Sequence, residues 1–222
     1  ANHLNISVIR MSVRQQHLAG EFELLGEVHN SVKSEQLPSQ NDIALILHTS
    51  GTTSRPKIVP LLHSNIVSSA ENIRESLSLS EQDICMNIMP LFHIHGLIAA
   101  VTASIGAGGS VWCTPGFDAL KFFRWLDDVS PSWFTAVPTM HQAILGRSER
   151  NKNIIDRNKL RFLRSSSASL PSQVMKELER VFSAPIIEGY GMTEATHQMA
   201  SNPLPPSKQK PGSVGLEAGP KI

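Results

Sequence analysis

From residue 43 onward, short segments rich in β-branched and aliphatic residues alternate with longer segments of helical periodicity. For example, apolar residues at 66, 70, 73 and 77 lie four, three and four positions apart, which places them on one helix face. A chain that alternates strands with helices forms a largely parallel sheet flanked by helices on both faces. The sequence therefore predicts an α/β fold. We expect strands at 43–49, 84–90, 109–115, 133–138, 160–166 and 184–191, and helices at 66–77, 96–105, 119–126 and 174–182.

Four segments that carry hydroxyl, glycine or histidine residues follow expected strands. In a parallel sheet, ligands bind at the carboxyl ends of the strands, so these segments form the candidate site. They are 48–60 (HTSGTTSRPKIVP), 89–96 (MPLFHIHG), 164–171 (RSSSASLP) and 188–199 (EGYGMTEATHQM). The formal charge of +1 gives no general argument for nucleic acid or an anionic membrane as partner, and no apolar run is long enough to span a bilayer.

The first segment combines a glycine, a lysine and several hydroxyls, as a phosphate-binding loop would. A nucleotide-hydrolase loop needs the spacing G-x-x-x-x-G-K-[ST]. Counted from Gly51, Lys57 falls at the right distance, but Pro56 replaces the second glycine and Ile58 replaces the magnesium-binding hydroxyl. Proline has no N–H donor and a fixed φ, which makes it unsuitable for cradling phosphate with backbone amides. We interpret the segment instead as a hydroxyl-rich arm that closes over a polyphosphate, with Lys57 as its cation.

The stretch TSGTTSRPK resembles the phosphate-binding signature of the adenylate-forming superfamily, which includes acyl-CoA synthetases, luciferases and peptide-synthetase adenylation domains. The usual form is TSGTTGxPKG, and this chain has Ser54 where glycine is usual and Ile58 where a second glycine is common. The resemblance implies that this chain is the central part of the large N-terminal domain of an acyl-CoA synthetase. The implied contacts to ATP phosphates are Thr49, Ser50, Gly51, Thr52, Thr53, Ser54 and Lys57.

The stretch MPLFHIHG resembles the second motif of the superfamily, in which an aromatic residue or a histidine gates the carboxylate pocket. A lone histidine after a strand is more often structural. Two of them, His93 and His95, with Gly96 allowing close approach, make a functional role equally plausible. Both interpretations stay open at this point.

The two remaining segments resemble the adenine loop of the superfamily and its most diagnostic motif, YGMTE. On its own, the serine cluster fits a helix entry equally well. The resemblance implies that Tyr190 stacks on adenine, that Thr193 donates to the α-phosphate and that Glu194 binds Mg²⁺. Gly189 and Gly191 are expected to let the backbone approach the nucleotide. The other implied nucleotide contacts are Ser167, Ala168, Ser169, Glu188 and Met192.

The reaction that the resemblance implies is the activation of a carboxylic acid by ATP. The acid attacks the α-phosphorus, pyrophosphate leaves, and coenzyme A then displaces AMP from the acyl-adenylate. The implied catalytic residues are Lys57, Thr193 and Glu194, with Mg²⁺ as the metal. Competing interpretations are a fatty-acid or aryl-acid CoA ligase, an adenylation domain that loads a carrier protein, and a truncated homologue that binds nucleotide without catalysis.

Within the superfamily, the chain looks most similar to oxalate–CoA ligases, including peroxisomal CoA-synthetase-like proteins. Four polar side chains are expected near the acid, whereas a fatty-acid tunnel needs an apolar lining. They are His93, His95, Ser167 and His197. We expect a protonated His197, paired with Ser167, to hold the second carboxylate of a small diacid such as oxalate.

The sequence also divides the chain. Residues 1–40 are interpreted as the end of a preceding subdomain and a linker, 41–200 as the AMP-binding subdomain, and 201–222 as a Pro/Gly-rich connection without regular structure. The superfamily pattern continues with a ribose-binding aspartate, a hinge and a small domain that carries a lysine, none of which is matched. We therefore expect this chain to be a piece that holds the ATP half of the site and has little turnover alone.

Two further expectations concern cysteines and charge. Cys85 and Cys113 have apolar neighbours and no CxxC spacing, so both are expected to be buried thiols of a reducing compartment, cytoplasmic or, as the alternative, peroxisomal. Residues 147–164 carry seven basic residues against Glu149 and Asp156. We expect a solvated basic loop there, with a contact to an anionic cofactor as the alternative.

Overall fold

The computed structural model describes residues 8–13, 21–26, 37–49 and 56–221. The chain divides into two compact units, Ala1–Pro38 and Ser39–Ile222. In the first unit, β1 (Arg10–Ser12) pairs antiparallel with β2 (Glu23–Leu25). β1 lies within the stretch 6–13 that its alternating apolar residues mark as β-rich, and β2 carries no comparable signal.

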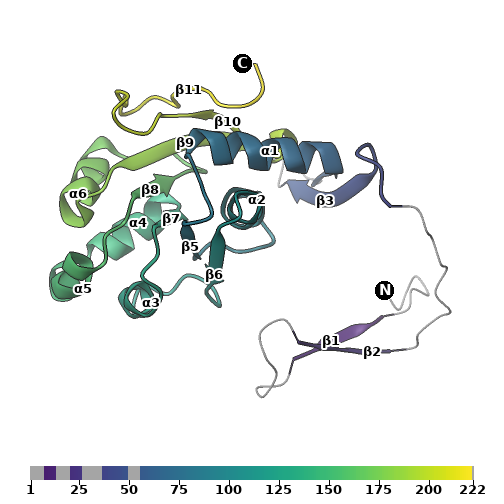
Figure 1. Cartoon of the computed structure of the whole chain (residues 1–222), viewed down its shortest axis with the longest axis horizontal. Helices are drawn as coiled ribbons and strands as arrows, with labels where there is room; N and C mark the ends of the chain where they lie inside the picture. The colour runs from purple at the N-terminus through teal and green to yellow at the C-terminus, as the bar shows by residue number, and fades with distance from the viewer. Residues whose placement is uncertain (1–7, 14–20, 27–36, 50–55, 222) are drawn as a thin grey trace. The chain divides into compact units, whose positions relative to one another are not determined.

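The second unit is built on a seven-stranded sheet with the order β11-β10-β9-β8-β7-β5-β6 (Figure 1). Five strands run parallel, and the two at one end are antiparallel to their neighbours. The predicted α/β class is confirmed, although the antiparallel end has no counterpart in the sequence-based expectation. The strands are β5 (Ile84–Asn87), β6 (Ser110–Cys113), β7 (Trp133–Ala136), β8 (Phe162–Ser165), β9 (Ile186–Met192), β10 (His197–Ser201) and β11 (Leu216–Glu217).

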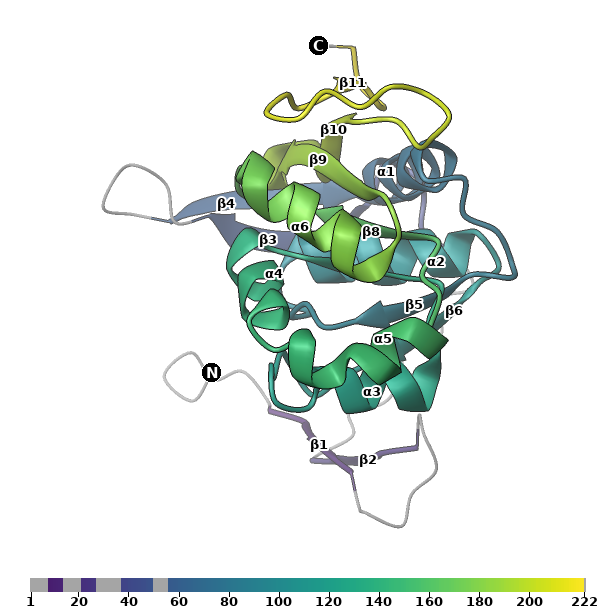
Figure 2. The same ribbon diagram turned by 90° about the vertical axis from the view of Figure 1, so that its left-hand side faces the viewer.

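Helices cover both faces of this sheet. On one face lie α1 (His63–Ser76), the π-helix η2 (His95–Thr102) and α2 (Ala103–Gly106); Figure 2 shows α5 and α6 in front of the strands on the other face. The helices of that second face are α3 (Phe122–Val129), α4 (Pro138–Leu145), α5 (Lys152–Arg157) and α6 (Ser172–Phe182). Two short 3₁₀ turns, η3 (Glu149–Asn151) and η4 (Thr193–Ala195), complete the unit.

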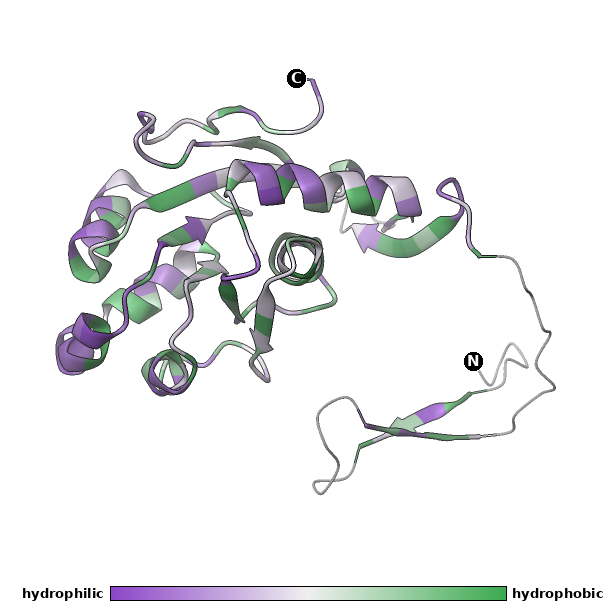
Figure 3. Cartoon of the chain, in the orientation of Figure 1, coloured by the Kyte–Doolittle hydropathy of each residue, from purple (hydrophilic) through white to green (hydrophobic). Residues whose placement is uncertain are grey.

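Alternate residues of each strand supply the two cores. Along β7 and β8, Trp133 and Phe162 pack toward α1 and η2, whereas Phe134 and Leu163 pack toward α3–α6. All four side chains are fully buried, which explains why β7 and β8 each begin with two consecutive apolar residues rather than an alternating pattern. The hydropathy colouring agrees, with β5 and β6 strongly apolar and α1 mixed (Figure 3).

The strand at 43–49 was expected in the parallel sheet, and that expectation is wrong. β3 (Ile43–Thr49) instead pairs antiparallel with β4 (Lys57–Leu62) in a separate two-stranded sheet. The physical reason is the short connection, because a parallel crossover needs a dozen or more residues and Thr49 is already the register partner of Lys57. This hairpin packs on the α1 side of the core through Leu47 and Leu61, among others.

Three further expectations need correction. Residues 147–164 form η3, α5 and most of β8 rather than a solvated loop, and Arg164 is fully buried. Cys85 is buried as expected, but Cys113 is exposed because it ends the edge strand β6. Residues 201–222 are mostly irregular, yet β11 pairs with β10. Within the described part of the chain, no helix is long and apolar enough to cross a membrane.

Candidate active site

Three of the four predicted segments lie at the carboxyl ends of neighbouring parallel strands. Residues 89–96 follow β5, residues 166–171 follow β8, and the YGMTE motif spans the end of β9 and η4. Because β5, β7, β8 and β9 are consecutive in the sheet, their carboxyl ends share one edge. The fourth segment lies on the β3–β4 hairpin, and its residues 50–55, including Ser50, Gly51, Thr52, Thr53 and Ser54, are outside the described residues.

The loop after β8 and the end of β9 enclose a hollow of about 300 Å³. Ser166 Oγ donates to the Gly189 carbonyl oxygen at 2.7 Å, which ties the two segments together. Tyr190 is 46% exposed, so its ring is partly accessible for stacking. The lining residues from these segments are Ser167, Ala168, Ser169, Glu188, Gly189, Tyr190 and Gly191, and Gly212, Ser213 and Val214 also line the hollow. The geometry thus brings the predicted adenine contacts together, with space for a flat ring.

Glu188 has a structural role at this hollow. One oxygen of its buried carboxylate accepts a hydrogen bond from the Leu170 backbone N–H at 3.1 Å, just ahead of α6. Its other oxygen, Oε2, has no partner among the described residues. Met192, also predicted as a nucleotide contact, is 42% exposed at the end of β9 and does not line the hollow.

The two glycines of the motif are also required by the packing of the protein itself. A Cβ on Gly189 would lie 2.5 Å from Nη2 of Arg164, and a Cβ on Gly191 would lie 1.5 Å from the carbonyl oxygen of His197. Both glycines therefore accommodate other parts of the protein on the side where a Cβ would project. The prediction that they lie next to the nucleotide is supported only by their position in the lining of the hollow.

His93 and His95 have separate environments. His95 is fully buried: its Nε2 lies 2.6 Å from Thr135 Oγ1 and its Nδ1 lies 3.0 Å from Ser167 Oγ. Burial, with a contribution from the positive charge of Arg164, holds the pKa of His95 well below its ordinary value, so the ring is neutral. His93 is exposed and accepts a hydrogen bond from the His95 backbone N–H at 3.1 Å. The structure therefore links His95, not His93, to the loop after β8.

The expected pairing of a protonated His197 with the Ser167 hydroxyl is not present. Ser167 Oγ contacts His95, and His197 Nδ1 has no hydrogen-bond partner among the described residues. Burial, followed by the charge of Arg164, lowers the pKa of His197 well below its ordinary value, so this ring is also neutral at neutral pH. The His95 and His197 rings are 5.4 Å apart, and His197 has a φ of 112°.

The cation of this region is Arg164, which the sequence-based site did not include. Its side chain is fully buried, and its Nη2 donates to Gln198 Oε1 at 3.1 Å. Burial lowers the pKa of Arg164 to about 10, which still leaves it charged at neutral pH. An arginine placed inside the apolar strand LRFLRSS was the available signal, but it was counted with the basic loop.

The predicted phosphate and metal ligands are more exposed. Lys57 begins β4 opposite Thr49, and β4 contacts η4, which carries Thr193 and Glu194. Thr193 lines a hollow of about 250 Å³ together with His93. Glu194 is exposed and lines a separate hollow of about 400 Å³ beside α1.

The donor set fits Mg²⁺ held by one protein carboxylate. No group of three or more His, Cys, Asp or Glu side chains in the described part of the chain is arranged to hold a metal ion. Mg²⁺ commonly binds one or two carboxylates together with water and substrate phosphates, so the single exposed carboxylate of Glu194 is compatible with that mode.

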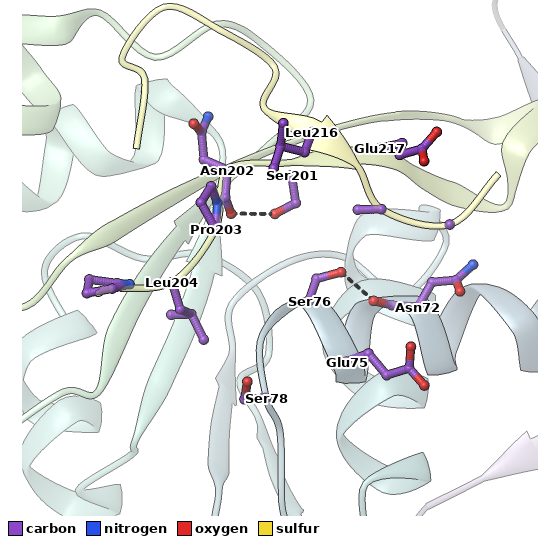
Figure 4. Close-up of a pocket in the computed structure, with 13 residues that line it drawn as sticks. Asn72, Glu75, Ser76, Ser78, Ser201, Asn202, Pro203, Leu204, Leu216 and Glu217 are labelled. Carbon is purple, nitrogen blue, oxygen red and sulfur yellow. Dashed lines mark hydrogen bonds between the residues drawn. The ribbon is translucent and has the colours of Figure 1, made fainter. Parts of the chain in front are cut away.

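A hollow of about 560 Å³ is formed by the end of α1 and the C-terminal segment (Figure 4). Its walls come from the end of α1, including Asn72 and Ser76, and from residues 201–205 and β11. None of the predicted site residues lines it, so its size does not make it the candidate active site.

A family model described as "AMP-binding enzyme" matches residues 5–219. Oxalate–CoA ligase of Arabidopsis thaliana is 47% identical over 189 residues, which cover 84% of this chain and 37% of that protein. Oxalate–CoA ligase of Saccharomyces cerevisiae is 44% identical over 190 residues, 86% of this chain and 34% of that protein.

A solved structure of ATP-bound MatB from Rhodopseudomonas palustris superposes with a TM-score of 0.73 at 30% identity. The match covers 82% of this chain and 35% of that one. The chain thus spans about a third of the length of the proteins it matches. Because the family model covers nearly all of its residues, the chain belongs to the AMP-binding enzyme family.

Proposed function

We propose that the whole protein activates a small carboxylic acid with ATP and transfers the acyl group to coenzyme A. The supporting observation is that the loop after β8 and the end of β9 line a hollow suited to adenine, and that Ser167 of this loop contacts His95 at the start of η2. In the first step a carboxylate oxygen bonds to the α-phosphorus as the bond to pyrophosphate breaks. In the second step the thiol sulfur bonds to the acyl carbon, AMP leaves, and the thiol proton goes to solvent.

The chain's own residues have positioning and charge-neutralising roles in this proposal. Tyr190 stacks on adenine, Thr193 donates to the α-phosphate, and Lys57 neutralises phosphate charge from the hairpin. When bound at Glu194, Mg²⁺ supplies charge neutralisation for the phosphates. The main barrier to the reaction is the approach of one anion to another, so no covalent protein nucleophile is required.

Glu194 provides the direct test of ligase activity. In the whole protein, Glu194→Gln removes the metal-binding charge but keeps the side-chain size. We expect acyl-adenylate formation, measured by pyrophosphate release, to fall at least about 100-fold, as for loss of a principal electrostatic stabiliser. Glu217→Gln, on the exposed edge strand β11, is the matched control. Unchanged adenylate formation in Glu194→Gln would remove the metal assignment. Nucleotide binding without adenylate formation in the unmodified protein would support the non-catalytic alternative.

We further propose that the acid is short and polar, with oxalate as the preferred substrate. Thr135, His95 and Ser167 form a hydrogen-bonded chain across β7, η2 and the loop after β8, where a fatty-acid tunnel would need apolar walls. The similarity to two oxalate–CoA ligases supports the same choice. Steady-state assays with oxalate, malonate, acetate and octanoate test it, and a preference for octanoate would contradict it.

A further inference from the structure

Arg164 presents a buried positive charge that the described residues do not neutralise. The side chain projects from β8 on the same face as Phe162, toward α1 and η2. Its one hydrogen bond within the described part of the chain goes to the neutral amide of Gln198, while Nε and Nη1 have no partner there. No carboxylate of the described residues forms an ion pair with it. Burial of an unpaired charge costs several kcal/mol, so a bound anion would offset a large penalty.

The groups around Arg164 are neutral and able to form hydrogen bonds. His95 and His197 are both close enough for the charge of Arg164 to disfavour their protonated forms. His197 Nδ1 has no partner among the described residues, and Ser167 Oγ lies against His95. A permanent cation, two neutral imidazoles and a hydroxyl form a suitable environment for a small anion.

The guanidinium also lies next to the candidate active site. Because a Cβ on Gly189 would come within 2.5 Å of Arg164 Nη2, the guanidinium packs directly against the Gly189 backbone. Gly189 and Ser167 both line the hollow assigned to adenine. The cation is therefore separated from that hollow by one layer of the chain, on the side where His95 and His197 lie.

We propose that Arg164 is the counter-ion for the second carboxylate of a short diacid substrate, and so determines its preference over a monoacid. The proposal rests on the proposed ligase function. The reacting carboxylate faces the α-phosphate near Thr193, and the other carboxylate accepts hydrogen bonds from Nε and Nη1 of Arg164. A diacid thereby supplies the missing negative charge, whereas acetate of similar size leaves the cation unpaired.

The test is substrate discrimination by the whole protein. We compare Arg164→Gln with unmodified protein by measuring kcat/KM for oxalate and for acetate through pyrophosphate release. Truncating one partner of a buried charge pair costs about 2–5 kcal/mol, which corresponds to a loss of about 30-fold to 4,000-fold for oxalate. We expect acetate to change less than about threefold. Arg164→Lys keeps the charge and should recover part of the oxalate activity.

Arg161→Gln is the matched control, because Arg161 lies three positions away but pairs with Asp83. The Arg161→Gln variant should leave the ratio of kcat/KM for oxalate to kcat/KM for acetate unchanged. An equal loss for both acids in Arg164→Gln would indicate a merely structural role and would overturn the proposal, as would an unchanged ratio.

Direct binding separates this proposal from the ligase function. Calorimetric titration of oxalate into the unmodified protein and into the Arg164→Gln and Arg164→Lys variants needs no turnover. Oxalate binding that weakens at least tenfold in Arg164→Gln supports the role of Arg164 even if the ligase function fails. Equal affinity in all three proteins overturns it even if the ligase function holds. If Arg164→Gln does not fold, the Arg164→Lys variant decides. Unchanged oxalate affinity with a conserved preference for oxalate over acetate supports the role of the Arg164 charge. Unchanged oxalate affinity with a lost preference for oxalate refutes that role.

Discussion

The β3–β4 hairpin and the strand-end cluster, defined as His95, Arg164, Ser167, Gly189 and His197, belong to one candidate site but are built differently. The hairpin is a two-stranded sheet with one packed face, and Ile43, Ile46 and Ile58 are more than half exposed. The cluster draws on β8, β9, β10 and η2, and its His95, Arg164 and His197 side chains are buried.

The difference indicates a division of labour within the site. Groups proposed for the acid lie on the packed sheet, where their geometry is over-determined by many neighbours. Lys57, proposed to neutralise phosphate charge, lies on a two-stranded element with one exposed face. Elements with fewer buried contacts than a central sheet open at lower free-energy cost. Substitutions on the sheet should therefore cost far more stability than substitutions on the hairpin.

Phe162→Ala should have the largest effect. Phe162 is fully buried two residues before Arg164, with its ring centroid 5.3 Å from that of Trp133. Its removal loses apolar burial and leaves a cavity, so we expect the free energy of unfolding to fall by about 3–5 kcal/mol. Urea denaturation measures the change. A loss below about 1 kcal/mol would mean that the sheet is no more tightly packed than the hairpin.

Gly191→Ala should have the next largest effect, with a loss of about 3 kcal/mol in the free energy of unfolding. The new Cβ would meet the His197 carbonyl oxygen, a backbone atom that cannot move without disturbing the β9–β10 pairing. Gly106→Ala is the matched control, because nothing lies within 4 Å of its added Cβ and alanine favours the helix. Equal stability of the two variants would contradict the close packing at the cluster.

Asp83→Asn should lower the free energy of unfolding by about 1–3 kcal/mol near neutral pH, as expected when hydrogen bonds to a charged group are lost. Burial of Asp83 opposes ionisation, but hydrogen bonds from Ser132, the Ser80 backbone and Arg161 outweigh it and hold its pKa below 3.8. A folded-state pKa below the unfolded value stabilises the protein above about pH 3.8, and this contribution is lost as pH falls.

Urea denaturation between pH 7 and pH 2 checks the Asp83 prediction. Unmodified protein should lose this increment of stability on acidification, and the Asp83→Asn variant should lack it. If the free energy of unfolding changes with pH in the same way for both proteins, the Asp83 carboxylate contributes nothing to stability. The result also sharpens the contrast with Arg164, because Arg161 has an internal carboxylate and Arg164 has none among the described residues.

Sequence predicted the parts of this structure whose signals are local, and it missed the parts that depend on residues distant in the chain. Apolar runs and periodicity located β5–β9, α1, η2, α3 and α6 because those signals are local, whereas α4 and α5 were not predicted. β4 and β10 were missed because their pairing depends on partners and because KIVPLL contains a proline, which usually argues against a strand. The motifs indicated His95 and Tyr190, but the burial of Arg164 depends on β9, β10 and η2 together. The apolar strand LRFLRSS around it was a weak local signal, and it does not show which elements bury the side chain.

Ile58→Ala should have the smallest effect and tests the hairpin half of the comparison. Ile58 lies in β4 next to Lys57 and is 66% exposed, so alanine removes little buried surface. We expect a change within about 0.5 kcal/mol by urea denaturation, roughly a tenth of the Phe162→Ala loss although both remove a large apolar side chain. A loss above about 2 kcal/mol would show that the exposed face of the hairpin is covered in solution. The hairpin would then be held as firmly as the sheet, and the interpretation of residues 48–60 as an arm that closes over a polyphosphate would lose its support from the exposed face.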